Sequence, residues 1–280
     1  MNSIIKKDNL KIIINGNNKK CIKRVEKNIF DKYKYLKSKN FLNIMDYQYV
    51  NGYEIRDYLE DISLNKEEKI SELLYLVTML HIKTTHYKSL TISDIKRFYE
   101  SETDEIFEIK NYYNKICEEY DLFMIMPPSV NLLIDNISLI FNSLDKSKMF
   151  LDKWYDVMKL KKRKRVVFNH NNLKDSNIIV NNNSYLINWN KSKIDSPIYD
   201  LLSLFKNNIK EIDLIDMFNI YESKYKLTIE EINLLFCKLL KIDKLLFNKK
   251  DIINTREVYY VLYYLNKINN FLDYYLKCEK

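Results

Sequence analysis

A small group of strand-like runs lies inside a part of the chain that otherwise has the pattern of helices. Arg165–Phe168 is short and apolar, and Asn177–Val180 and Tyr185–Ile187 flank an Asn-rich turn. Helical periodicity precedes this group from about residue 92 to 160 and resumes after Pro197. Simple α+β folds separate runs of strands from runs of helices, so we expect this strand island to hold a functional loop.

The N-terminal part of the chain has the alternation typical of strands, and Asn-Gly turn signals occur twice in it. A helical stretch with apolar residues at helical spacing separates the two hairpins. The expected elements are the strands Leu10–Ile14 and Lys20–Val25 around the turn Asn15-Gly16-Asn17-Asn18, the helix Glu26–Ser38, and the strands Phe41–Val50 and Tyr53–Leu59 around Asn51-Gly52.

The rest of the chain is expected to be mainly helical, with a break at Pro127-Pro128. Asn65 and Glu68 have capping-box spacing before one helix, as do Thr228 and Glu231 before another. The expected helices are Asn65–His81, Ser93–Tyr120, Val130–Asn142, Lys146–Leu160, Thr228–Leu246 and Ile252–Leu276. The sequence thus predicts an α+β protein with a β-rich lobe over residues 1–60 and a helical lobe over residues 61–280.

The composition of the chain argues against some kinds of functional site. Gly occurs only 2 times in 280 residues, which argues against a Gly-rich phosphate-binding loop. The 4 cysteines form no C-x-x-C pair, and with the 3 histidines they show no zinc-ligand spacing. Scattered thiols and a charged N-terminus without a long apolar run predict a cytoplasmic protein without a membrane span. The formal charge of +8 suits either an anionic partner or a solvated surface.

Three pieces of the segment from residue 165 to 201 form a recognisable pattern. They are His170–Asn177 after a strand, Ile187-Asn188-Trp189 after a hairpin, and Asp195–Leu201 at the start of a helix. This pattern resembles the signature of the aminoglycoside phosphotransferase and choline kinase superfamily, and it is also similar to kinase-like proteins associated with bacterial spore coats. The resemblance implies a two-lobed protein-kinase-like fold with a small β-rich N-lobe and a large, mainly helical C-lobe.

The resemblance also implies roles for single residues. In the loop, Asn172 occupies the position of the catalytic base Asp, and Asn177, five places later, matches the metal-binding Asn. Asn188 occupies the position of the second metal ligand, an Asp in the family. His170 and Asp200 match residues that brace the loop.

The first lobe is expected to supply the nucleotide site. Lys23 matches the phosphate-pairing lysine of the third strand, and Glu60 lies in the segment that corresponds to the hinge between the lobes. The helical stretch 92–160 matches the insertion that shapes the acceptor site in such enzymes.

The departures from the family pattern concern the catalytic groups. Asn172 has no titratable group near neutral pH, so it cannot accept a proton from a substrate hydroxyl. Asn188 and Asn177 offer only neutral carbonyl oxygens to Mg²⁺, which prefers charged oxygen ligands. No acidic partner of Lys23 stands out in the following helix, where only Glu26 and Asp31 are candidates.

We therefore expect a pseudokinase that acts as a binding or scaffold module for an unknown small molecule or protein, with weak or absent binding of ATP and Mg²⁺. One alternative is an active ATP-dependent small-molecule phosphotransferase with an atypical metal site. A second alternative is a protein that binds nucleic acid or an acidic surface through the basic run Lys159–Arg165, although a solvated loop is favoured for that run.

Overall fold

The structure is a computed structural model that describes residues 2–7, 10–15, 18–26, 28–62, 64–120 and 125–278. It has the mixed α+β class predicted from the sequence, and the chain divides into two compact units. The first unit consists of Met1–His86, Arg165–Ile212 and Met217–Lys226. The second consists of Tyr87–Lys164, Asp213–Asp216 and Leu227–Lys280. The predicted lobe boundary at residue 60 stays a prediction.

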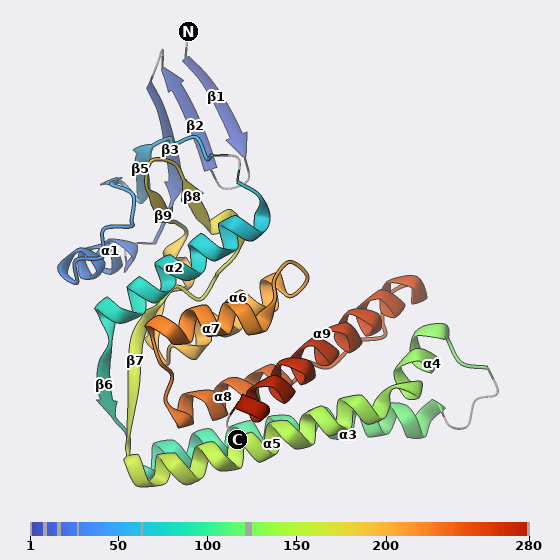
Figure 1. Ribbon diagram of the computed structural model, residues 1–280. Helices are drawn as coiled ribbons and strands as arrows, with labels where there is room; N and C mark the ends of the chain where they lie inside the picture. Colours follow the sequence, from blue (N-terminus) through green and yellow to red (C-terminus); the bar gives the residue numbers. More distant parts are fainter. Residues whose placement is uncertain are drawn as a thin grey trace. The chain divides into compact units, whose positions relative to one another are not determined.

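The first unit begins with an antiparallel sheet of five strands in the order β1-β2-β3-β5-β4 (Figure 1). The strands are β1 (Asn2–Lys7), β2 (Leu10–Asn15), β3 (Asn18–Arg24), β4 (Gln48–Val50) and β5 (Tyr53–Asp57). Helix α1 (Asn28–Ser38) lies between β3 and β4 in the chain and buries Ile29, Tyr33 and Leu36. In the predicted turn between β2 and β3, Gly16 and Asn17 lie outside the described residues.

One predicted strand is wrong over most of its length. The run Phe41–Val50 was expected to be extended, but only β4 at its end is a strand. Phe41, Ile44 and Met45 are instead buried in an irregular segment, and Ile44 forms a parallel bridge with Leu186. Packing against the later hairpin outweighs the local preference for a strand here.

The second part of the first unit contains the strand island. Helix α2 (Lys66–Thr84) begins with the predicted capping box, in which Asn65 Oδ1 accepts a hydrogen bond from Glu68 N at 2.8 Å. The later elements are β7 (Arg163–Asn169), β8 (Ile178–Val180), β9 (Ser184–Leu186), β10 (Lys193–Asp195), α6 (Ile198–Asn208) and α7 (Leu214–Lys224). Strand β7 pairs with β10, and β8 pairs with β9, both antiparallel. The β8–β9 hairpin packs on α2 (Figure 1).

The second unit is a group of helices: α3 (Ile92–Tyr120), α4 (Pro128–Asp135), α5 (Ile137–Lys161), α8 (Ile229–Leu240) and α9 (Asp251–Cys278). The chain reaches it through β6 (His86–Ser89). The core side chains Leu144, Leu235 and Phe236 are fully buried. No helix within the described ranges is long and apolar enough to cross a membrane.

Two helix boundaries differ from the prediction. The expected break between Asn142 and Lys146 is absent, and α5 is continuous because no Gly or Pro interrupts it. The break lies earlier, at Asn136. Helix α8 ends at Leu240 rather than Leu246, because Lys241 leaves the helical conformation with a ψ of 113°.

Candidate functional site

The predicted catalytic loop follows β7 and ends in a turn of 3₁₀-helix. Asn177 is the last residue of this turn, and it is only 4% exposed. Both of its backbone polar groups form hydrogen bonds, since Asn177 N donates to Lys174 O at 2.9 Å and Asn177 O accepts from Ile187 N at 3.0 Å. These bonds join the loop to the segment after β9, so the strand-loop-strand order brings Asn177 next to Asn188.

The predicted site residues form one continuous chain of hydrogen bonds. Lys23 Nζ donates to Asn188 Oδ1 at 2.6 Å, and Asn188 Nδ2 donates to Asn177 Oδ1 at 2.7 Å. Asn177 Nδ2 in turn donates to the backbone oxygen of Asn172 at 2.6 Å. Each amide uses its oxygen as acceptor and its nitrogen as donor, so the chain runs in one direction from the ammonium of Lys23 to the loop backbone.

Asn188 has a backbone conformation that suits its residue type. Its φ and ψ of 66° and 53° are left-handed, a region that Asn occupies more readily than most residues with a Cβ. The turn that follows is held from α1, because Lys32 Nζ donates to the backbone oxygens of Trp189 and Asn190, both at 3.2 Å. Two lysines from different elements therefore contact the three residues from Asn188 to Asn190.

Lys23 faces a carboxylate that the sequence analysis missed. In the register of β3 and β5, Lys23 lies opposite Glu54, which is only 8% exposed. Glu54 Oε2 accepts a hydrogen bond from the hydroxyl of Tyr33 at 3.4 Å, and its Oε1 lies 3.9 Å from Arg56 Nε. Burial lowers the pKa of Lys23, while the charge of Glu54 acts in the opposite direction.

The sequence does hold a signal for Glu54. Glu54 and Arg56 share one face of β5 by alternation, and a charged pair on the side of the sheet that meets a helix is unusual unless the two residues are paired. The acidic partner of Lys23 therefore comes from the neighbouring strand and not from the following helix, where Glu26 and Asp31 were the candidates.

His170 and Asp200 lie together in the core behind the loop, and both are fully buried. Asp200 accepts hydrogen bonds from the backbone nitrogens of His170 at 2.9 Å and Asn171 at 2.6 Å. His170 Nε2 lies 2.8 Å from Ile187 O, and its ring meets Trp189 edge to face. Burial lowers the pKa of His170, which favours the neutral imidazole.

A further histidine completes this buried group. His81, near the end of α2, lies with Nε2 at 3.1 Å from Asp200 Oδ2 and with Nδ1 at 2.7 Å from the hydroxyl of Tyr221. Asp200 thus has three partners, and the carboxylate connects α2, the loop and α6. A buried carboxylate needs such bonds to offset its loss of hydration.

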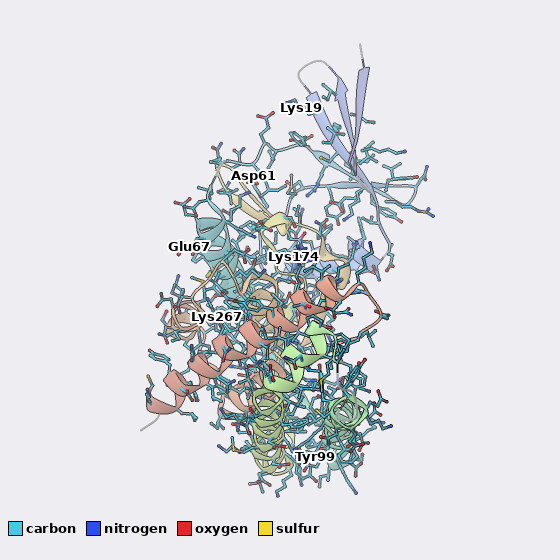
Figure 2. The ribbon with its side chains drawn as sticks, turned by 90° about the vertical axis from the view of Figure 1, so that its right-hand side faces the viewer. Lys19, Asp61, Glu67, Tyr99, Lys174 and Lys267 are labelled. Atoms are coloured by element: carbon cyan, nitrogen blue, oxygen red, sulfur yellow. The ribbon has the colours of Figure 1, made fainter. Side chains whose placement is uncertain are left out.

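Glu60, the predicted hinge residue, lies in the segment between β5 and α2. Its side chain is exposed and pairs at 2.6 Å with Lys19 on β3, a residue that is labelled in Figure 2. Its backbone oxygen accepts from Asn181 Nδ2 at 2.6 Å. The neighbouring Asp61 accepts from Val180 N at 2.9 Å, so the segment is attached to the β8–β9 hairpin at more than one point.

The residues of this site do not fit a magnesium ion. None of the three linked asparagines has a carboxylate, and the side-chain oxygens of Asn177 and Asn188 already accept hydrogen bonds. Within the described part of the chain, no three His, Cys, Asp or Glu side chains gather closely enough to hold a metal ion. Mg²⁺ in phosphate-binding sites is held through one or two carboxylates, which this arrangement lacks.

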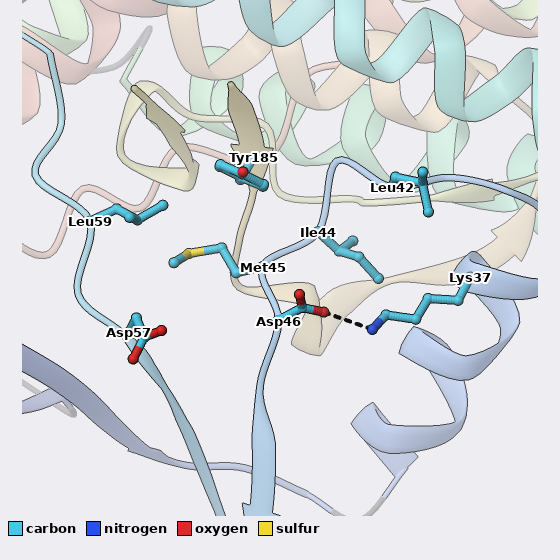
Figure 3. A pocket seen from close by; sticks show the side chains of 8 residues that line it. All are labelled: Lys37, Leu42, Ile44, Met45, Asp46, Asp57, Leu59 and Tyr185. Carbon is cyan, nitrogen blue, oxygen red and sulfur yellow. Dashed lines mark hydrogen bonds and ion pairs between the residues drawn. The ribbon is translucent and has the colours of Figure 1, made fainter. Parts of the chain in front are cut away.

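A separate cavity of about 470 Å³ lies in the first unit (Figure 3). No predicted site residue lines it. Lys37 and Asp46 form an ion pair of 2.8 Å at this cavity. Its lining residues are Lys37, Leu42, Ile44, Met45, Asp46, Asp57, Leu59 and Tyr185.

Several side chains of the basic run Lys159–Arg165 already have partners. Two of them form ion pairs and two more lie over tyrosine rings, which leaves fewer side chains free to meet phosphates. The pairs are Lys159 with Asp156, Lys161 with Glu230, Arg163 with Tyr87, and Arg165 with Tyr225.

Comparisons with known proteins give a match in structure. No family model and no curated protein matches the sequence. The fold is similar to a solved aminoglycoside phosphotransferase from Alicyclobacillus acidocaldarius, with a TM-score of 0.71 at 10% identity over 97% of this chain and 90% of that one. The protein-kinase-like fold predicted from the sequence is therefore confirmed, and at this identity the likeness concerns the fold.

Two other solved structures overlap with lower scores. Choline kinase LicA from Streptococcus pneumoniae has a TM-score of 0.48 at 14% identity, over 97% of this chain and 92% of its own. AMP-bound spectinomycin phosphotransferase has a TM-score of 0.48 at 13% identity, over 94% of this chain and 86% of its own.

Proposed function

We propose that this chain is a kinase-fold binding or scaffold protein without phosphotransferase activity, a degenerate relative of aminoglycoside phosphotransferases and choline kinases. One observation carries the proposal: the positions of the two catalytic carboxylates hold Asn172 and Asn188. Both belong to a chain of hydrogen bonds that runs from the ammonium of Lys23 to the backbone oxygen of Asn172. The link to spore-coat-associated kinase-like proteins stays a prediction from the sequence.

The first missing group is the base. A positioned base speeds proton transfer by about 10²- to 10⁴-fold, and an amide cannot take its part. Asn172 contributes its backbone oxygen to the loop, where it accepts from Asn177. We therefore assign Asn172 a role in loop structure and none in proton transfer.

The second missing group is the anchor for a metal ion. Phosphoryl transfer in kinases depends on metal ions that neutralise charge on the transferred group. At Asn188 the nearest charged group is the ammonium of Lys23, which would repel a divalent cation. The site thus lacks both the base and the electrostatic centre of the reaction.

The remaining predicted residues have supporting roles in the proposal. Asp200 holds the backbone at His170 and Asn171, and His170 fills the space between the loop and Trp189. Lys23 and Glu60 are proposed contacts of a nucleotide, Lys23 on the phosphate side and Glu60 in the segment between the lobes. We propose residues 1–60 and 61–280 as the two lobes, and the four free thiols favour a reducing compartment such as the cytoplasm.

An active small-molecule phosphotransferase is the second candidate. The likeness to an aminoglycoside phosphotransferase over 97% of the chain favours it. It would need a metal site built from other residues, with a carboxylate brought to Asn177 by a change in the loop.

A turnover assay separates the two candidates. The protein is incubated with ATP, Mg²⁺ or Mn²⁺, and a panel of aminoglycosides, choline and sugars, and ATP consumption is followed by ³¹P NMR. We expect no consumption above that of a blank without protein. Turnover that the Lys23→Met variant loses and the Lys20→Met variant keeps would refute the proposal, since Lys20 lies on the opposite face of β3.

A further inference from the structure

We propose that the site around Asn188 binds the phosphate group of a nucleotide-like ligand without a divalent cation, with the ammonium of Lys23 in contact with the phosphate. The inference rests on the proposed function, and it separates the two ligands that were expected to bind weakly or not at all: the phosphate binds and Mg²⁺ does not. The reason is that the residues of the site do not suit the magnesium ion that kinases of this fold use.

The charge around the turn favours an anion. Lys23 and Lys32 reach the turn from β3 and α1, with Nζ atoms 2.6 Å from Asn188 Oδ1 and 3.2 Å from Trp189 O. The negative charge of Glu54 favours the charged form of Lys23, but Glu54 also pairs with Arg56. The negative charge of Glu26 favours the charged form of Lys32. These three cations and two carboxylates leave an excess of positive charge, which repels a divalent cation and attracts a phosphate.

The donors at the site are not exhausted. An ammonium has three N–H groups, and Lys23 donates one of them to Asn188 Oδ1. Lys23 is half-buried, and burial disfavours its charged form, so an anion against it would be stabilised by the ammonium and would stabilise it in return. In the described part of the chain no side-chain acceptor besides Asn188 is bonded to Lys23.

The turn is also held in shape by protein bonds alone. Ser192 Oγ donates to Trp189 O at 2.6 Å, and the indole of Trp189 donates to Leu186 O at 3.0 Å. Lys32 adds bonds to the same backbone. A site that is preorganised in this way does not need a cation to order it before an anion binds.

Binding of ADP with and without metal tests the inference. Calorimetric titrations are run in excess EDTA and in millimolar Mg²⁺, with wild-type protein and the Lys23→Met variant. We expect ADP to bind in EDTA at least as tightly as in Mg²⁺, and Lys23→Met to weaken it by about tenfold or more, as loss of a charge-assisted contact predicts. The matched control Lys20→Met, on the opposite face of β3, should leave the affinity unchanged.

Pyrophosphate identifies the part of ADP that is recognised. Displacement of ADP by pyrophosphate in EDTA supports a phosphate contact, and failure to displace it overturns the assignment of Lys23 to the phosphate. If Lys23→Met does not fold, as judged by circular dichroism, Lys32→Met provides the second variant, with Lys34→Met, exposed on the same helix, as its control.

The outcomes also separate this inference from the proposed function. ADP binding that requires Mg²⁺, or no ADP binding in either buffer, overturns metal-free phosphate binding and leaves an inactive kinase fold in place. Consumption of ATP in the turnover assay with Mg²⁺ overturns the proposed function itself.

Discussion

Replacing Asn188 by Asp restores the charge that kinases use, and we expect it to destabilise this protein in the absence of metal. Asn188 Nδ2 donates to Asn177 Oδ1 at 2.7 Å, and a carboxylate has no proton to donate. Rotation of the Asn177 amide does not solve the problem, because its nitrogen already donates to Asn172 O at 2.6 Å. One of the two bonds is lost in either orientation.

The size of the effect follows from these contacts. Loss of one bond that leaves a buried acceptor unsatisfied costs about 1–3 kcal/mol, and it outweighs the gain of about 1 kcal/mol from a charged acceptor facing Lys23. Asp tolerates the left-handed backbone at this position nearly as well as Asn, so the backbone adds little. From the middle of that range we expect a net loss of about 1 kcal/mol in the free energy of unfolding in EDTA.

Urea unfolding of wild type, Asn188→Asp and Asn190→Asp measures this loss. Asn190 is exposed and lies in the same turn, so Asn190→Asp adds the same charge near Lys32 without removing the amide bond. Millimolar Mg²⁺ should recover part of the stability of Asn188→Asp alone. An Asn188→Asp variant as stable as wild type in EDTA, or equal losses in both variants, would contradict the role of the amide chain.

Three further changes test other parts of the account. Burial lowers the pKa of His170, so its contribution to stability is present above pH 6.5 and is lost as the pH falls towards the folded pKa, by up to about 1.4 kcal/mol per pH unit. In urea unfolding, the difference in free energy of unfolding between wild type and His170→Asn should therefore shrink on acidification. A difference that stays constant with pH would count against this. Asp200→Ala should cost about 3–5 kcal/mol, because it leaves two buried backbone N–H groups without acceptors; a loss below about 1 kcal/mol in the same assay would show that the brace is unimportant. In the second unit, Glu102→Ala should cost about 3 kcal/mol, because Lys238 and Lys241 lose their shared buried partner. Hydrogen exchange in α3 and α8 should then be faster in the variant than in the wild-type protein, and an equal exchange rate would contradict this.

The catalytic-loop segment could be predicted from the sequence because its signals are local. Turn residues and strand alternation indicated the strands of this segment. The roles of His170, Asn177, Asn188 and Asp200 within it were implied by the resemblance to the family signature. The structure brings the three asparagines within hydrogen-bond distance of one another or of the loop backbone.

The partner of Lys23 could not be found in the same way. Glu54 meets Lys23 only through the pairing of β3 with β5, and that pairing depends on which strands become neighbours. Local patterns do not report strand order or register. The same reason explains the error at Phe41–Val50, where burial beside Leu186 decides the conformation.

The wrong boundary at the end of α8 depends on a tertiary contact. Lys241 ends α8 and turns towards Glu102 on α3, a contact between residues far apart in sequence. The capping box at Asn65 was predicted correctly, because both of its partners lie within one turn. At Thr228 half of the box is present, in which the backbone nitrogen donates to Glu231 Oε2 at 2.9 Å.

The central claim is that amides have replaced the two catalytic carboxylates, so that the site holds no divalent cation. Electron paramagnetic resonance of Mn²⁺ tests it directly, because free Mn²⁺ gives a signal that is lost on binding to protein. With wild-type protein and ADP, we expect no loss of signal beyond that caused by ADP itself, whereas the Asn172→Asp, Asn188→Asp double variant should deplete it. Depletion by the wild-type protein to the same extent as by the double variant would contradict the account.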